Sequence, residues 1–289
     1  MTTQAPVEQM SRRDLDSMLA NHPAVDSFPR RNLYGRLGIH PMRLSTKSLP
    51  MEARVFAKSL WSSNAPKPFV LYGRPRSGTT LVVKLLNQLP GVTCDGELLN
   101  GFLFSPVGLM SRLPKRARPG VKTYGIKILS YQLMEIQRVH HPLAFFDSLA
   151  SRGYRVIHFT RNTWDQTLSL LKAHESGVYF SKSLNGSQTL RLDPERFFEL
   201  LKWNEGMLEY EKAVMAHVDH FSLSYERDLK ENTQHQKTID ALSTFLGTAS
   251  ASVNATMKRT GGDRGLQKVE NLDEVIEHVR QTELAHLVP

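Results

Sequence analysis

A loop rich in glycine, arginine and hydroxyl residues, GRPRSGTT at residues 73–80, has the composition of a phosphate-binding site. Both glycines and the final threonine match the spacing of the P-loop pattern G-x-x-x-x-G-K-[ST]. Thr79, however, stands where that pattern has the lysine that reaches the terminal phosphates of ATP. The cations here are Arg74 and Arg76, and a forked guanidinium suits an oxyanion group that lies beyond the innermost phosphate.

The segments on either side of this loop favour a phosphate site. KPFVLYG at 67–73 is a short apolar run, which predicts a buried strand, and TTLVVKLLNQL at 79–89 has the apolar period of a helix. Between such a strand and helix, backbone N–H groups form a concave anion site, and the helix N-terminus adds partial positive charge. A glycine turn with solvent-facing arginines is the alternative. The residues expected to bind phosphate are Arg74, Arg76, Ser77, Gly78, Thr79 and Thr80.

Strands and helices alternate along the rest of the chain. Further strands are predicted at 123–130, 154–160 and in DHFSLSYERDL, with helices between them, one of which opens with Thr163 and Gln166 at capping-box spacing. This order predicts an α/β fold of three layers, α/β/α, around a mainly parallel central sheet whose ligands bind beyond the carboxyl ends of the strands. Residues 1–65 are expected to form a helical extension, and 66–289 the main part of a single domain.

The run PRSGTTL, followed by LLNQLPGVTCDGELLN, resembles the 5′-phosphosulfate loop of the sulfotransferases, whose donor is 3′-phosphoadenosine 5′-phosphosulfate (PAPS). The arginine at position 76 resembles the residue found there in the tyrosylprotein and carbohydrate-type branches and in bacterial carbohydrate sulfotransferases. The cytosolic branch has lysine at this position. The resemblance covers roughly residues 66–250. It implies a P-loop NTPase-like sulfotransferase fold and transfer of a sulfonate group, for which a lysine aimed at a γ-phosphate is not needed.

Other segments are similar to further motifs of this family. Its 3′-phosphate motif is a strand-end arginine with a helix-borne serine eight residues later, and Arg161 and Ser169 have that spacing. SYERDLKEN is similar to the segment with a Y-x-x-L pattern that follows a strand in this family, which implies that Tyr225 lies near the adenine. MKRTGGDRG loosely resembles a loop that covers the 3′-phosphate in the cytosolic branch, so Lys258 and Arg259 are candidates, with a solvated charge run as the alternative.

Glu97, in the run CDGELL, is the predicted catalytic base. The tyrosylprotein and carbohydrate-type branches have a glutamate shortly after a similar strand, which implies that it takes the proton of the acceptor hydroxyl. Partial burial would make it a better base, because a glutamate ordinarily titrates near pH 4.3. A carboxylate that balances a helix dipole is the alternative. Arg76 is the second predicted catalytic residue, since it would stabilise the bridging and leaving oxygens.

Neighbouring residues are weaker candidates for catalysis. The cytosolic branch has a histidine base after a strand lysine, but here Leu129 stands where the histidine would follow Lys127. Lys127 could contact the sulfonate or the acceptor, or extend to the surface. Structural roles are predicted for the remaining candidates: turns for Asp95, His140 and His141, and core packing for His158 and Trp203.

Composition restricts the class of protein. A chain of 289 residues with 40% hydrophobic residues can build a packed core. Lys and Arg exceed Asp and Glu by 37 to 28, a net charge of +9 that suggests an anionic partner. One cysteine allows neither an intramolecular disulfide nor a cysteine zinc cluster, which is typical of a reducing cytoplasm. Without an apolar signal region or a long apolar run, a cytoplasmic location without membrane insertion is expected.

Two other functional classes fit less well. A P-loop kinase or NTPase with a non-standard loop would need a lysine at Thr79 and an Asp at a Walker-B position, and no such Asp is evident, so no metal requirement is expected. A nucleic-acid-binding protein would fit the positive charge, but zinc-finger, helix-turn-helix and RRM signatures are missing. The expected partners are PAPS, its product 3′,5′-adenosine bisphosphate (PAP) and a hydroxyl-bearing acceptor, with a carbohydrate or glycolipid favoured over a small alcohol or phenol.

Overall fold

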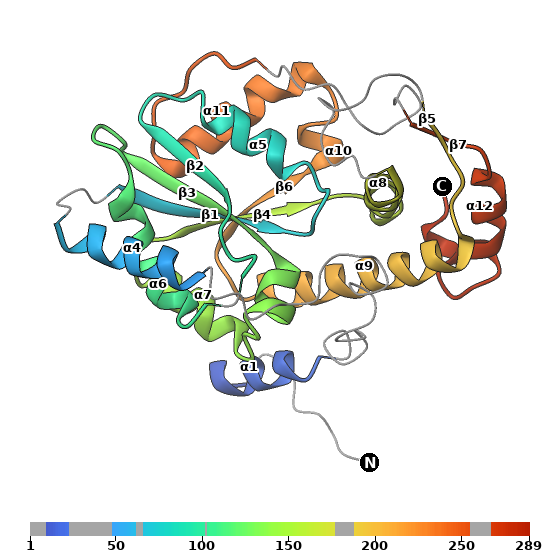
Figure 1. Cartoon of the computed structure of the whole chain (residues 1–289), viewed down its shortest axis with the longest axis horizontal. Helices are drawn as coiled ribbons and strands as arrows, with labels where there is room; N and C mark the ends of the chain where they lie inside the picture. The colour runs from blue at the N-terminus through green and yellow to red at the C-terminus, as the bar shows by residue number, and fades with distance from the viewer. Residues whose placement is uncertain (1–9, 23–47, 62–65, 102, 177–187, 255–266) are drawn as a thin grey trace.

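The computed structural model describes residues 10–22, 48–61, 66–101, 103–176, 188–254 and 267–289. At its centre is a five-stranded sheet with the order β2-β3-β1-β4-β6, in which every neighbouring pair is parallel (Figure 1). Because β3 and β4 flank β1, the strand order reverses at β1, and in such sheets ligands bind beyond the carboxyl ends at that point. The strands are β1 (Lys67–Gly73), β2 (Val92–Glu97), β3 (Thr123–Leu129), β4 (Arg155–Thr160) and β6 (His220–Ser224).

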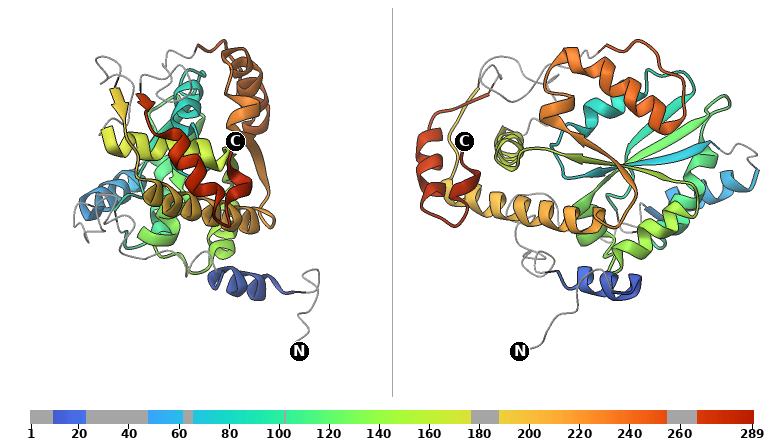
Figure 2. Two further views of the ribbon diagram at one scale, coloured as in Figure 1. Left: turned by 90° about the vertical axis from the view of Figure 1, so that its right-hand side faces the viewer. Right: turned by 180° about the vertical axis from the view of Figure 1, so that it is seen from behind.

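Helices cover both faces of this sheet (Figures 1 and 2). Side chains of β1 alternate between the two layers: Phe69 and Leu71 pack in a cluster with α5 and α11, and Val70 and Tyr72 pack in the larger cluster on the opposite face. This arrangement confirms the predicted three-layer α/β/α fold. One layer contains α5 (Thr79–Leu86) and α11 (His235–Leu246), and the other contains α4 (Ser48–Trp61), α6 (Pro106–Arg112), α7 (Pro142–Ala150) and α9 (Pro194–Met215).

The remaining elements surround these layers. Helix α8 packs along α9, α12 packs on the same helix, and β5 pairs in parallel with β7 in a second small sheet. Among the described residues, no helix combines the length and the apolar composition that crossing a membrane requires. These elements are α1 (Arg12–Ala20), η2 (Leu113–Arg116), η3 (Gln132–Ile136), α8 (Thr163–Ser176), β5 (Gln188–Leu190), α10 (Tyr225–Asp228), η5 (Asn232–Gln234), β7 (Gln267–Val269), α12 (Leu272–Arg280) and η6 (Ala285–Leu287).

The N-terminal segment, for which a helical extension is predicted, contains α1 and α4. Leu15, Leu19 and Val55 from these helices belong to the larger core cluster, and α1 packs on α7 and α9. The described helices of this segment therefore complete the main core.

Two local predictions are wrong. The capping box of α8 does not form, because Asn162 Oδ1 accepts the hydrogen bond from the N–H of Asp165 (3.0 Å), and asparagine is a strong N-cap residue. The side chain of Gln166 instead donates to the carbonyl of Pro75 in the glycine loop. Asp95 lies in β2 and not in a turn, since Tyr124 Oη donates to it from the neighbouring strand.

Candidate active site

The glycine loop connects β1 to α5 in a conformation that gathers backbone N–H groups at the start of the helix. Gly78 is the N-cap of α5 with φ of 96°, and the Tyr225 ring lies 2.8 Å from where a Cβ on Gly78 would be. Arg76 also has a positive φ, of 61°, which is unfavourable for a residue with a side chain. Such strained positions cluster at ligand-binding sites, where the surrounding structure holds them. The loop therefore has the geometry of an anion site.

Arg161 and Ser169 lie beside this loop. Arg161 directly follows β4, its guanidinium stacks 4.4 Å above the ring of Tyr225, and Nη1 donates to the carbonyl of Arg76 (2.9 Å). Arg161 Nε is buried and has no hydrogen-bond partner in the part of the chain that the structure describes. Ser169 Oγ accepts a hydrogen bond from Arg76 Nε (3.3 Å). The structure thus brings together four of the predicted site residues, and the unpaired buried Nε is suited to an anionic ligand.

Glu97 ends β2 and is linked to helix α5 through Lys127. The Nζ atom of Lys127 is 2.7 Å from Glu97 Oε1 and donates to Thr80 Oγ1 at 3.5 Å. Lys127 is buried, so of the two roles left open for it the structure favours the one at the site. Asn100 Nδ2 and Gln132 Nε2 donate to the other carboxylate oxygen of Glu97 (3.1 and 3.4 Å). The carboxylate is therefore held in place at the edge of the sheet that carries the loop.

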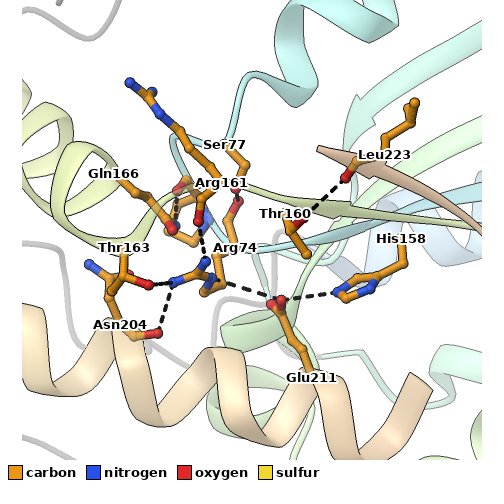
Figure 3. Close-up of polar contacts among 11 residues, drawn as sticks. Arg74, Ser77, His158, Thr160, Arg161, Thr163, Gln166, Asn204, Glu211 and Leu223 are labelled. Carbon is orange, nitrogen blue, oxygen red and sulfur yellow. Dashed lines mark hydrogen bonds and ion pairs between the residues drawn. The ribbon is translucent and has the colours of Figure 1, made fainter. Parts of the chain in front are cut away.

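The structure corrects the role predicted for Arg74 (Figure 3). Its side chain is 0% exposed and points into the protein, so it cannot contact a phosphate at the surface of the loop. The guanidinium donates to the carbonyls of Asn204 (2.9 Å) and Arg161 (2.8 Å), and its Nε lies 3.9 Å from the buried carboxylate of Glu211. Burial lowers the pKa of the Arg74 guanidinium, an effect that the nearby carboxylate of Glu211 opposes. A buried carboxylate needs a paired cation, which explains the inward direction.

Ser77 and Thr79 are also buried. The Ser77 hydroxyl donates to the carbonyl of Arg74 (2.6 Å) and so closes the loop from within. For Ser77 and Thr79, the groups suited to a phosphate are therefore the backbone N–H groups and not the side chains. The predicted candidates Lys258 and Arg259 lie outside the described residues.

Two of the residues predicted to be structural, His158 and Trp203, lie in the core. His158 is buried with Nε2 3.3 Å from Glu211 Oε2, and Trp203 is buried in the larger cluster, so core packing is confirmed for both. Among the described residues, no group of three or more His, Cys, Asp or Glu side chains has an arrangement that could hold a metal ion. Metal independence stays a prediction.

Glu135 is an acidic residue near the site that sequence reasoning did not single out. It lies in η3, directly after β3, and accepts a hydrogen bond from Trp203 Nε1 (3.3 Å). Burial raises the pKa of Glu135 to about 7, and the hydrogen bond from Trp203 opposes this shift. Since the folded protein then holds this proton more tightly than the unfolded chain does, stability falls as the pH rises from about 4.5 to about 7.

Glu135→Gln is therefore expected to stabilise the protein at high pH only. A glutamine of the same shape does not ionise, so at pH 8 the variant should exceed the wild type by roughly 3 kcal/mol in free energy of unfolding. Urea denaturation of both proteins at pH 5 and pH 8 measures this, and the difference should shrink strongly at pH 5. An equal difference at both pH values would contradict the prediction.

Comparison with known proteins gives relatives for part of the chain. No family model matches it. Over 130 residues the chain is 32% identical to nodulation protein H of Rhizobium tropici, which covers 41% of this chain and 51% of the relative. Nodulation protein H of Rhizobium meliloti (strain 1021) is 30% identical over 130 residues, covering 40% and 51%. The chain therefore spans about half the length of the curated relatives it matches.

The comparisons support the resemblance to the PAPS-dependent sulfotransferases. A crystal structure of a mouse sulfotransferase complexed with PAP also matches, with 14% identity and a TM-score of 0.38, over 81% of this chain and 92% of that chain. In this chain the residues that resemble the sulfotransferase motifs follow or end three strands of the central sheet, with Arg76 after β1, Glu97 at the end of β2 and Arg161 after β4.

The structure adds polar partners that the sequence did not reveal. Asn100 and Gln132 hold Glu97, and Gln166 and Asn204 hold the loop and Arg74. Asparagine and glutamine are common in connecting segments and helices, and nothing in the spacing of these four marks them as site residues. Their recognition required the three-dimensional arrangement.

Proposed function

We propose that this protein is a sulfotransferase, which transfers the sulfonate group of PAPS to a hydroxyl group of an acceptor. The observation that carries the proposal is the bridge from the loop helix to the base: Lys127 contacts Thr80 of α5 and Glu97 of β2. A phosphate-binding loop and a carboxylate that can take a proton thereby lie at one edge of the sheet. In-line group transfer between a bound donor and a hydroxyl needs both groups at one place.

The two phosphate groups of the donor would be bound by separate parts of the site. The loop N–H groups and the N-terminus of α5 are suited to the 5′-phosphate, because they combine backbone hydrogen-bond donors with partial positive charge. Arg161 and Ser169 are suited to the 3′-phosphate, and the unpaired buried Nε of Arg161 supports this role. Tyr225 packs between Gly78 and Arg161, so it would position both phosphate sites. Adenine contact by Tyr225 remains part of the proposal.

PAPS supplies an activated sulfonate, whose bond to the 5′-phosphate oxygen breaks as its sulfur bonds to the acceptor oxygen. Glu97 would accept the proton that the acceptor hydroxyl loses. Arg76 would stabilise the negative charge that develops on the leaving phosphate oxygen. Lys127, which holds the Glu97 carboxylate, would keep it directed at the acceptor. In this scheme these side chains position groups and offset charge.

A carbohydrate hydroxyl is the acceptor that the surroundings of Glu97 favour. Asn100, Gln132 and Tyr131 gather beside the carboxylate, with Tyr131 Oη donating to Asn100 Oδ1 (3.3 Å). Amide and phenol groups offer both donors and acceptors, which is the chemistry that several neighbouring sugar hydroxyls require. A kinase or NTPase remains the alternative, but Thr79 replaces its lysine and is buried.

Calorimetric binding of PAP without added metal tests the donor site. We expect the wild type to bind PAP and Arg161→Ala to bind about 10- to 100-fold more weakly, because a charge-assisted hydrogen bond to phosphate is lost. Arg152→Ala is the matched control, since Arg152 donates hydrogen bonds to Ser148 and Ser151 at the end of α7, and it should bind as the wild type does. If the wild type fails to bind PAP but binds ATP with magnesium, the chain is a kinase or NTPase.

A further inference from the structure

We propose that Arg74 is a positioning residue that sets the spacing between the 5′-phosphate loop and the 3′-phosphate clamp formed by Arg161 and Ser169. This inference rests on the proposed function, because the spacing matters only for a donor that carries both phosphate groups. Arg74 itself touches neither group, since its side chain is fully buried.

The geometry joins the two sites through one guanidinium. The backbone of Arg74 belongs to the loop, two residues before Arg76, while its side chain reaches the junction of β4 and α8. There Nη2 donates to the carbonyl of Arg161 (2.8 Å) and Nη1 to Thr163 Oγ1 (3.3 Å). Figure 3 shows the Arg161 side chain pointing away from Arg74, so the backbone of Arg161 is held while its guanidinium faces the opposite way. Any shift of Arg74 would move the clamp relative to the loop.

Other buried contacts fix the same junction. Gln166, one turn into α8, donates from Nε2 to the carbonyl of Pro75 in the loop (2.6 Å). Asn204 of α9 accepts from Arg74 Nη1 at its carbonyl (2.9 Å) and donates from Nδ2 to Thr167 Oγ1 (2.9 Å). The loop, α8 and α9 therefore form one braced unit in which Arg74 has the most partners.

The charge of Arg74 is balanced from the opposite side by Glu211, which is 0% exposed and also contacts His158. A guanidinium is planar and forked, so it can bind several acceptors at fixed angles at once, whereas a lysine ammonium at the end of a flexible chain cannot. The residue type is therefore matched to holding Asn204, Thr163 and Arg161 together. Glu211 keeps the side chain inside, because an uncompensated buried carboxylate would be costly.

The consequence is a spacing effect on donor binding. When one ligand binds through two groups, the second contact gains from the first only if the two sites are held at the distance the ligand requires. A shift of the order of 1 Å would leave each phosphate site able to bind but weaken the benefit of having both. Loss of Arg74 should therefore reduce the affinity for PAP selectively, over that for ligands with one phosphate.

The test compares three ligands by calorimetry: PAP, adenosine 5′-phosphate and adenosine 3′-phosphate. The main variant is Arg74→Met combined with Glu211→Leu, which removes both buried charges together, and such replacements are commonly tolerated. We expect its PAP affinity to fall about tenfold or more, while both monophosphates bind within about threefold of the wild type. Arg12→Met is the matched control, because Arg12 also makes several side-chain bonds, to Asp147 and His217, at the opposite end of the sheet.

The outcomes separate this inference from the proposed function. If the wild type does not bind PAP, both fail. If it binds PAP and the folded variant keeps the wild-type ratio of affinities, or loses affinity for all three ligands equally, only the role of Arg74 is overturned. If the double variant does not fold, the single variants Arg74→Lys and Gln166→Leu replace it in the test. Each of them weakens the contacts between the loop and α8 while Glu211 is left unchanged, and the same selective loss of PAP affinity is expected.

Discussion

Glu97→Gln is expected to lower kcat by about 10²- to 10⁴-fold, the usual contribution of a general base. The amide keeps the shape of the side chain and can still accept a hydrogen bond from Lys127, but it cannot take the acceptor's proton. PAP affinity should change little, because in the proposed site Glu97 faces the acceptor and not the phosphates. Radiolabelled PAPS with a panel of neutral oligosaccharides gives kcat for the best acceptor, and calorimetry gives the PAP affinity.

Asp95→Asn is the matched control for Glu97→Gln. Asp95 lies on the same strand, two residues earlier, but it is engaged by Tyr124 Oη and lies 3.8 Å from Arg116, away from Lys127. It should retain activity within a few-fold. An equal loss in both variants would mean that β2 needs its carboxylates for structure, and Glu97 would no longer be the base.

The fold could be predicted because short sequence patterns indicate most of its strands and helices. The apolar runs of β1, β3 and β4, the amphipathic period of α5 and the glycines that end helices are all properties of short segments. Gly247, the C-cap of α11, and Gly153, in the turn that follows α7, both have positive φ. The loop was predicted from its residue types between a strand and a helix, and the pairing of Arg161 with Ser169 was predicted from the resemblance to a sulfotransferase motif.

The direction of Arg74 could not be predicted from such patterns. Arg74 and Arg76 are two residues apart in one loop and have the same side chain, yet one is fully buried and the other reaches Ser169. The difference arises from Glu211, on a helix far along the chain, which places a buried carboxylate behind the loop. Long-range electrostatic pairing of this kind leaves no local signal.

The hydrogen-bond partners of Glu97 could not be predicted for the same reason, because they too are distant in the sequence. Asn100 and Gln132 come from segments that follow two different strands, and they meet only because β2 and β3 are neighbours in the sheet. Sequence order places β1 between α4 and α5 but does not reveal that β3 is inserted between β1 and β2. A polar cluster built across such an insertion becomes visible only when the strand order is known.

Arg76→Met is expected to lower kcat by about 10²- to 10³-fold, the usual cost of removing a donor aimed at charge that develops in the transition state. The KM for PAPS should rise less than kcat falls, because the loop N–H groups and Arg161 still bind the phosphates. The measurement is the same radiolabelled transfer, at saturating and limiting PAPS.

Arg76→Lys separates charge from backbone strain. Residue 76 has a φ of 61°, and methionine and lysine, both unbranched, meet the same steric cost there. Any difference between the two variants therefore reports the positive charge. We expect kcat of Arg76→Lys to be at least tenfold higher than kcat of Arg76→Met. The lysine ammonium can still reach the leaving oxygen, although it lacks the fixed fork of a guanidinium. Equal activities would show that the position contributes only its backbone conformation, and the stabilising cation would have to be sought in Lys127, which bridges Glu97 and Thr80.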